Sequence, residues 1–209
     1  MHGTIRRKTG RSAANLALHP RHVSRYVAHN VFNGGSPLEL EIPWFSYAAV
    51  DFLDKYLRPD MVIGEYGSSG STLFFARRAR SVYSIHNNAY WFELVKQRLA
   101  PKRISNVTIE VFPFDFKSPV GLEDSAYLRA LRNRRCDVIV VDATEEWTPV
   151  RPACFRFAED RIRPGGIIVL DDSWRYPALR RENRARQQSG LRKCRAVSAR
   201  RDQQRCVFY

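Results

Sequence analysis

Polar residues that could do chemistry recur in this sequence where apolar segments end. The run of residues 61–64 ends at Glu65, and the longer run of residues 136–141 ends at Asp142. The complete set is Glu65, His86, Asp115, Asp142, Asp171 and Asp172. Carboxylates and imidazoles accept protons, bind cationic ligands and hold metal ions, so we expect the functional site among these residues.

A turn of small residues, Gly67-Ser68-Ser69-Gly70-Ser71-Thr72, directly follows Glu65 and Tyr66. The apolar residues before it predict a strand, and those after it predict a helix. Glycines allow a backbone to bend sharply and to approach a ligand closely. The unpaired N–H groups at the start of the following helix would face polar or anionic groups, so the turn is predicted to bind a ligand.

Strand-like and helical patterns alternate through the rest of the chain. Strands are predicted at residues 61–66, 81–86, 107–112, 136–142 and 167–171, and helices at 44–57, 70–79, 89–99, 123–133, 151–162 and 177–188. This alternation predicts an α/β fold with a doubly wound, mostly parallel sheet. Ligands of such sheets bind beyond the carboxyl ends of the strands, where the polar set lies. Residues 194–199 and 205–209 predict a closing antiparallel hairpin.

The charge of this 209-residue chain is concentrated at its two ends. The net charge is +14, with +6 in residues 1–30 and +9 in residues 173–209, whereas residues 31–172 are almost neutral. Basic ends attract phosphate, nucleic acid or anionic surfaces, although solvated basic faces are the alternative. We expect a basic, partly helical extension over residues 1–40, with a short helix at 22–32, and one α/β domain over residues 41–209.

Several classes of protein are disfavoured by composition. No apolar run approaches the roughly 20 residues that span a bilayer, so no membrane segment is expected. Four cysteines without zinc-like spacing are typical of reduced thiols, which favours a cytoplasmic protein. No motif indicates an oligomeric state.

The motifs together resemble the class I S-adenosylmethionine-dependent methyltransferases over roughly residues 40–209. Glu65-x-Gly67-x-x-Gly70 is similar to that family's first motif, and Pro164-Gly165-Gly166 resembles the turn before its fifth strand. The resemblance, nearest to small bacterial O-methyltransferases, implies a seven-stranded Rossmann-like sheet with a reversed last strand. It also implies S-adenosylmethionine binding by Glu65, Tyr66, Gly67, Ser68, Gly70, Ser71, His86, Asn87, Asp115 and Asp142.

Two positions depart from the family pattern. The family usually carries an acid at the end of the second strand for the ribose hydroxyls, and His86 stands there, followed by Asn87. A neutral imidazole lacks the two charged acceptor oxygens of a carboxylate, so weaker cofactor binding or a changed ligand is expected. Ser69 stands where a third glycine is common, which restricts the loop backbone.

The acids after the fourth and fifth predicted strands are candidates for catalysis or for metal binding. Asp142 and Asp171 are candidate catalytic residues, and with Asp172 they could hold Mg²⁺, because hard cations prefer carboxylate oxygens. Catechol-type O-methyltransferases, which this arrangement resembles, use such an ion to orient a substrate hydroxyl. The alternative is that they are ordinary strand-end acids. Trp147 and Trp174, in the loops that follow, could flank an acceptor or simply pack.

The leading interpretation is a methyltransferase that acts on a hydroxyl of a small-molecule or glycan-type acceptor. An RNA methyltransferase would explain the basic ends, but no N-P-P-Y-type tetrad follows Asp142. A non-catalytic binding protein with the same fold is a second alternative, because of His86. A nucleotide-dependent dehydrogenase is disfavoured, because Ser68 and Ser69 break the G-x-G-x-x-G pattern.

Overall fold

The computed structural model describes residues 20, 23–27, 36–118, 120–143, 150–185, 187–190 and 205–208. One sheet contains five consecutive parallel strands: β1 (Val62–Tyr66), β2 (Ser81–His86), β3 (Val107–Val111), β4 (Cys136–Val141) and β5 (Ile162–Leu170). Their order is β3-β2-β1-β4-β5, so the direction of winding reverses between β1 and β4. This order confirms the predicted α/β class, and it makes the β1–β4 edge the expected ligand site.

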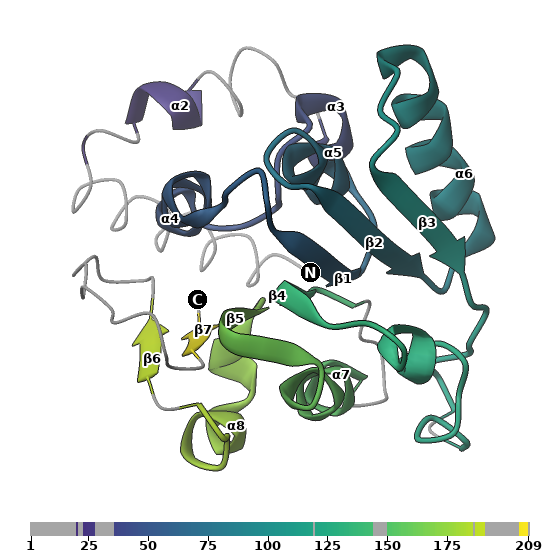
Figure 1. The fold of residues 1–209 in the computed structure, drawn as a ribbon, viewed down its shortest axis with the longest axis vertical. Helices are drawn as coiled ribbons and strands as arrows, with labels where there is room; N and C mark the ends of the chain where they lie inside the picture. Colours follow the sequence, from purple (N-terminus) through teal and green to yellow (C-terminus); the bar gives the residue numbers. More distant parts are fainter. Residues whose placement is uncertain are drawn as a thin grey trace, which may run out of the picture.

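Helices cover both faces of this sheet (Figure 1). α4 (Tyr47–Tyr56) and α5 (Gly70–Ala76) pack on one face, and α6 (Ala89–Leu99) lies on the same side. α7 (Val150–Glu159) packs on the other face, beside α8 (Pro177–Arg181). Strand β4 is buried on both faces because its sequence, Cys-Asp-Val-Ile-Val-Val, is apolar at almost every position.

Two short N-terminal helices are also described. α2 (Val23–Val27) falls within the helix predicted at residues 22–32, and α3 (Pro37–Leu40), which was not predicted, lies against α5. Ser36 and Glu39 form a reciprocal capping box that starts α3. Among the described residues, no helix is both long and apolar enough to cross a membrane.

The prediction of a helix at residues 123–133 is wrong. The structure contains turns there and a 3₁₀ segment, η4 (Leu128–Leu131). Ser125 explains the difference, because its hydroxyl donates to the Leu122 carbonyl and accepts from the Leu128 N–H. These side-chain bonds compete with the backbone bonds of an α-helix.

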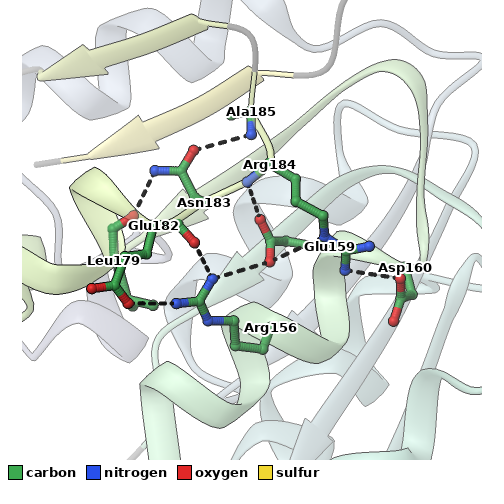
Figure 2. Close-up of polar contacts among 8 residues, drawn as sticks. All are labelled: Arg156, Glu159, Asp160, Leu179, Glu182, Asn183, Arg184 and Ala185. Carbon is green, nitrogen blue, oxygen red and sulfur yellow. Dashed lines mark hydrogen bonds and ion pairs between the residues drawn. The ribbon is translucent and has the colours of Figure 1, made fainter.

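The C-terminal prediction also needs correction. α8 ends at Arg181, not at residue 188, because the Asn183 side chain donates to the Leu179 carbonyl and accepts from the Ala185 N–H (Figure 2). The chain then forms β6 (Gln187–Gly190) and, after residues outside the described part, β7 (Arg205–Phe208).

Strand β7 pairs parallel with both β5 and β6, so it does not run in the antiparallel direction expected for it. The predicted hairpin partner at residues 194–199 lies outside the described residues. Parallel neighbours cannot be joined by a tight turn and need a connection of about a dozen residues or more. The chain between β6 and β7 is long enough for that.

Candidate functional site

Gly67 directly follows β1 and packs against Asp142, the residue that follows β4. Its φ angle is +108°, and a Cβ atom on it would lie 2.2 Å from the Asp142 carbonyl oxygen. Its N–H donates to the Ile85 carbonyl at 2.8 Å, so the turn is also fixed to β2. Only glycine combines this dihedral angle with so close a backbone contact. The close backbone approach seen here is to the Asp142 carbonyl, and it brings the glycine turn to Asp142.

Glu65 lies beneath the turn and is not among the residues that line the pocket described below. Its carboxylate is fully buried and accepts hydrogen bonds from the hydroxyls of Ser71, Thr72 and Ser84, the last two at 2.6 and 2.7 Å. Burial raises the pKa of Glu65 to about 7, and the hydroxyl bonds partly oppose this rise. Glu65 and Ser71, both predicted to contact a cofactor, are thus bonded to each other, and the Glu65 carboxylate links β1 to α5 and to β2.

Two further motif residues that were predicted to bind the cofactor, Tyr66 and Gly70, make packing contacts within the protein. The Tyr66 hydroxyl donates to the Leu128 carbonyl at 2.6 Å, and its ring packs on Tyr127 in the core. A Cβ on Gly70 would lie 2.0 Å from the Pro37 carbonyl oxygen, so this glycine lets α3 pack on α5. The sequence pattern could not distinguish packing from ligand binding here, because a small or an aromatic residue suits both.

A pocket of about 420 Å³ opens beside the turn, at the carboxyl ends of β1, β2 and β4. Its lining comes from the segment before α4, the turn after β1, the ends of β2 and β4, and the first turns of α6 and α7. The lining residues are Trp44, Gly67, Ser68, His86, Asn87, Asn88, Tyr90, Trp91, Asp142 and Arg151. Five of the predicted site residues are therefore brought together: Gly67, Ser68, His86, Asn87 and Asp142.

His86 is a neutral hydrogen-bond donor at this pocket. Burial lowers the pKa of His86 to about 4, so the imidazole is uncharged at neutral pH. Its Nδ1 accepts from the Asn88 N–H at 2.9 Å, which leaves the ring proton on Nε2. The side chain of Asn88 accepts from the Trp91 N–H and caps α6. The Trp91 indole donates to the Ser68 carbonyl at 2.5 Å, so the wall is held to the turn.

The strand-end acids lie together as predicted, but they surround an arginine. Arg151, in the first turn of α7, donates from Nη2 to Asp142 and from Nη1 to Asp171, both at 2.9 Å. Its Nη1 is 3.6 Å from Asp172, and its Nε donates to the Ala143 carbonyl at 2.8 Å. Sequence reasoning missed Arg151. The only signal was a basic residue at the start of the helix after the fourth strand.

The pKa values of Asp142 and Asp171 are both raised in this cluster, because the two acids are largely removed from water. Burial raises the pKa of Asp142, and the neighbouring Asp171 carboxylate adds to the rise, whereas the Arg151 guanidinium opposes it. The predicted Mg²⁺ site does not fit these residues, because a guanidinium lies where their oxygens converge. Within the described ranges, no group of three His, Cys, Asp or Glu side chains is arranged to hold a metal ion.

The remaining candidates are not at the pocket or cannot be placed. Asp115 is exposed, and its carboxylate accepts from the Lys117 N–H in a local turn. Trp174 is half exposed and donates to Asp172, and it is not among the lining residues. Trp147 lies outside the described residues.

Comparison with known proteins gives similarities of fold. No family model matches the chain, and no curated protein matches it. A methyltransferase-like protein from Silicibacter pomeroyi is 23% identical, with a TM-score of 0.48 over 62% of this chain and 73% of that one. An rRNA methylase from Streptococcus thermophilus is 18% identical, with a TM-score of 0.46 over 63% and 74%. The precorrin 8W decarboxylase of Methanobacterium thermoautotrophicum is 19% identical, with a TM-score of 0.46 over 66% and 71%.

Proposed function

We propose that this protein is an S-adenosylmethionine-dependent methyltransferase whose cofactor binds in the pocket beside Gly67. The observation that carries the proposal is the left-handed Gly67 turn against Asp142, at the edge where the sheet reverses its winding. The cofactor would supply a methyl group on a positively charged sulfur. The protein would bind and orient it, and would exclude water from it.

The charge of the site favours a cationic ligand of this kind. Asp142, Asp171 and Asp172 provide three carboxylates against one guanidinium, that of Arg151, although the whole chain carries +14. Trp91 and Tyr90 provide aromatic faces suited to a planar base. The Nε2–H of His86 would donate to a ribose oxygen, so a hydroxyl would act there as acceptor.

For the acceptor, we propose a hydroxyl of a small molecule or of a glycan-type compound. Asp142 is the candidate base, because its side chain lines the pocket and a carboxylate oxygen there can accept a proton from a bound hydroxyl. Asp171 would orient it through the shared Arg151. Trp44 and Tyr90 line the pocket with 78% and 74% of their surface exposed, so they are placed to contact an acceptor. Trp147 and Trp174 are proposed as further acceptor contacts from their positions in the sequence alone.

Two related proposals concern the rest of the chain. Residues 1–40 would form a basic extension to the α/β domain of residues 41–209, in a cytoplasmic protein. The basic ends could instead contact a nucleic-acid acceptor, and this alternative predicts RNA binding that weakens steeply with salt.

The test is calorimetric titration of the full chain with S-adenosylmethionine and with its demethylated product. We expect binding by the wild type and its loss in Gly67→Ala. Gly121→Ala is the matched control, because Gly121 also has a positive φ, of +77°, but a Cβ on it would meet nothing within 4 Å. A wild type that binds neither compound at millimolar concentration would refute the proposal and favour the non-catalytic binding protein.

A further inference from the structure

The segment of residues 36–46 connects α3 to α4 and reaches the pocket on the way. It begins at Ser36, which caps α3, and ends at Ser46, which caps α4 by accepting from the Ala49 N–H. We call these residues the strap. Trp44, which lines the pocket, belongs to it.

The strap packs directly on α5, the helix that follows the glycine turn (Figure 1). A Cβ on Gly70 would lie 2.0 Å from the Pro37 carbonyl oxygen and 2.7 Å from that of Ile42, so the two backbones are in close contact. Leu38 packs on the apolar cluster that α5 forms with α6. The strap is therefore held against the helix whose first turn belongs to the site.

Glu41 adds a charged contact in the middle of the strap. Its carboxylate pairs with Lys102 at 2.6 Å, with Arg98 at 3.6 Å and with Arg77. These cations lie directly after α5, on α6 and in the 3₁₀ segment η3 (Ala100–Lys102). The Glu41 side chain is only 10% exposed. One largely buried carboxylate therefore ties the strap to two helices.

The backbone of Glu41 indicates that its charge is what the position needs. Its φ angle is +55°, at the left-handed C-cap of α3, where glycine is usual because a β-carbon is strained there. Burial opposes ionisation of Glu41, but the bonds from Lys102 and Arg77 outweigh it, so the pKa of Glu41 lies below its ordinary value. The strained position thus carries an ionised carboxylate with three cationic partners.

Trp44 projects from this packed strap into water. It is 78% exposed, whereas the next residue, Phe45, is 8% exposed and packs in the core. Tyr90, from the start of α6, lines the same pocket and is 74% exposed. An aromatic ring in water gains free energy when a ligand covers it. The strap therefore presents an uncovered indole at the pocket.

We propose that Glu41 is a positioning residue that latches the strap to α5 and α6, and so holds Trp44 against the cofactor bound in the pocket. The contact with the cofactor rests on the proposed function, whereas the latch is a property of the free chain. Without the carboxylate, Arg77, Arg98 and Lys102 lose the anion that they share, and the strap loses its tie to both helices.

The first test follows hydrogen exchange of the full chain without ligand. The N–H groups of Leu40 and Ile42 donate to carbonyls within the strap, so their exchange reports its opening. Glu41→Gln keeps the size of the side chain and removes its charge, and should accelerate exchange in the strap by about ten-fold or more while β4 is unchanged. Unchanged exchange in the strap, or an equal acceleration in β4, would overturn the proposal.

Two further variants separate the latch from other effects. Glu93→Gln is the matched control, because Glu93 is a 54% exposed acid on α6 that pairs with Lys96 at 3.4 Å. It should leave exchange in the strap unchanged, and an acceleration equal to that of Glu41→Gln would overturn the proposal. Glu41→Gly relieves the backbone strain but removes the carboxylate, so it should still open the strap. A Glu41→Gly strap as protected as that of the wild type would also overturn it.

The second test is a double-mutant cycle with S-adenosylmethionine, measured by calorimetry. Trp44→Ala and Glu41→Gln should each weaken binding by roughly ten-fold, the size of a lost aromatic stacking contact. The double variant should bind no more weakly than the weaker single variant, because Glu41 acts through Trp44.

Two outcomes of this cycle would overturn the proposal. One is unchanged binding in either single variant, and the other is a loss in the double variant equal to the product of the two single losses. A wild type that binds no cofactor would refute the proposed function, and the contact of Trp44 with the cofactor would fail with it. Hydrogen exchange in the free chain would still decide whether Glu41 latches the strap.

Discussion

Helix α7 carries two arginines that both pair with acids, and the two sites differ in almost every other respect. Arg151, in the first turn, is 10% exposed between Asp142 and Asp171. Arg156, further along the helix, is 43% exposed and contacts Glu159 and Glu182 (Figure 2). The same pair of chemical groups therefore lies at a largely buried edge of the sheet at one place and at an exposed connection at the other.

The exposed cluster fastens the segment after α8 to α7. Glu159 accepts from the Arg184 N–H at 2.6 Å, and the Arg184 guanidinium pairs with Asp160 at 2.8 Å (Figure 2). Arg156 also donates to the Glu182 carbonyl. These bonds fix where the chain leaves α8 toward β6. Water and salt compete for most of them, so each is expected to contribute little free energy.

The largest predicted difference is between Arg151→Met and Arg156→Met. Arg151→Met leaves the largely buried Asp142 and Asp171 without their cation, which should lower the free energy of unfolding by about 3–5 kcal/mol. Arg156→Met removes exposed pairs and should cost less than about 1 kcal/mol. Chemical denaturation of both variants at pH 7 measures the two values. Equal losses would show that burial does not separate the two sites.

Glu65 is a third case to set beside the two arginine sites, because it is a buried acid whose hydrogen-bond partners are hydroxyls. Its pKa is about 7 in the folded chain, above the ordinary value of 4.5, so the folded state holds the extra proton between these values. The free energy of unfolding should therefore fall as pH rises from about 4.5 to 7, by at most about 3 kcal/mol. Unfolding scans across pH 5 to 8 should show a smaller fall in Glu65→Gln. An unchanged slope would contradict the assignment.

An intermediate effect is expected at Glu159, the most buried acid of the exposed cluster. Its side chain is 4% exposed and accepts from a backbone N–H, that of Arg184. Glu159→Ala removes this acceptor and should cost about 1–2 kcal/mol, measured by denaturation. Glu182→Ala, on the exposed side of Arg156, is the control and should cost less. The reverse order would show that exposure does not rank these acids.

The smallest predicted effect is a difference in salt dependence. The loss caused by Arg156→Met should shrink by a few tenths of a kcal/mol between 0.05 and 1 M NaCl, because the screening length falls to about 3 Å. The loss caused by Arg151→Met should stay constant, because buried pairs are screened much less. Denaturation at the two salt concentrations measures both. A strong salt dependence of the Arg151→Met loss would show that the ion pairs of Arg151 are exposed to solvent.

Particular residues show which parts of the fold could be predicted from the sequence. The five strands, the glycine turn and the meeting of Asp142 with Asp171 were predictable, because apolar periodicity and strand ends are local properties of the chain. Asn183 and Ser125 redirected predicted helices through side-chain bonds, which periodicity does not reveal. The direction of β7 was not predictable either, because strand pairing is a long-range contact.

At the site, the sequence by itself determined that acids and a glycine turn would meet at one edge of a parallel sheet. Only the tertiary structure decided which way each side chain points. It turned Glu65 inward onto three hydroxyls and inserted Arg151 among the acids. The physical reason is that a buried charge takes whichever partner the packed chain brings within hydrogen-bond distance, and that partner can be far away in the sequence.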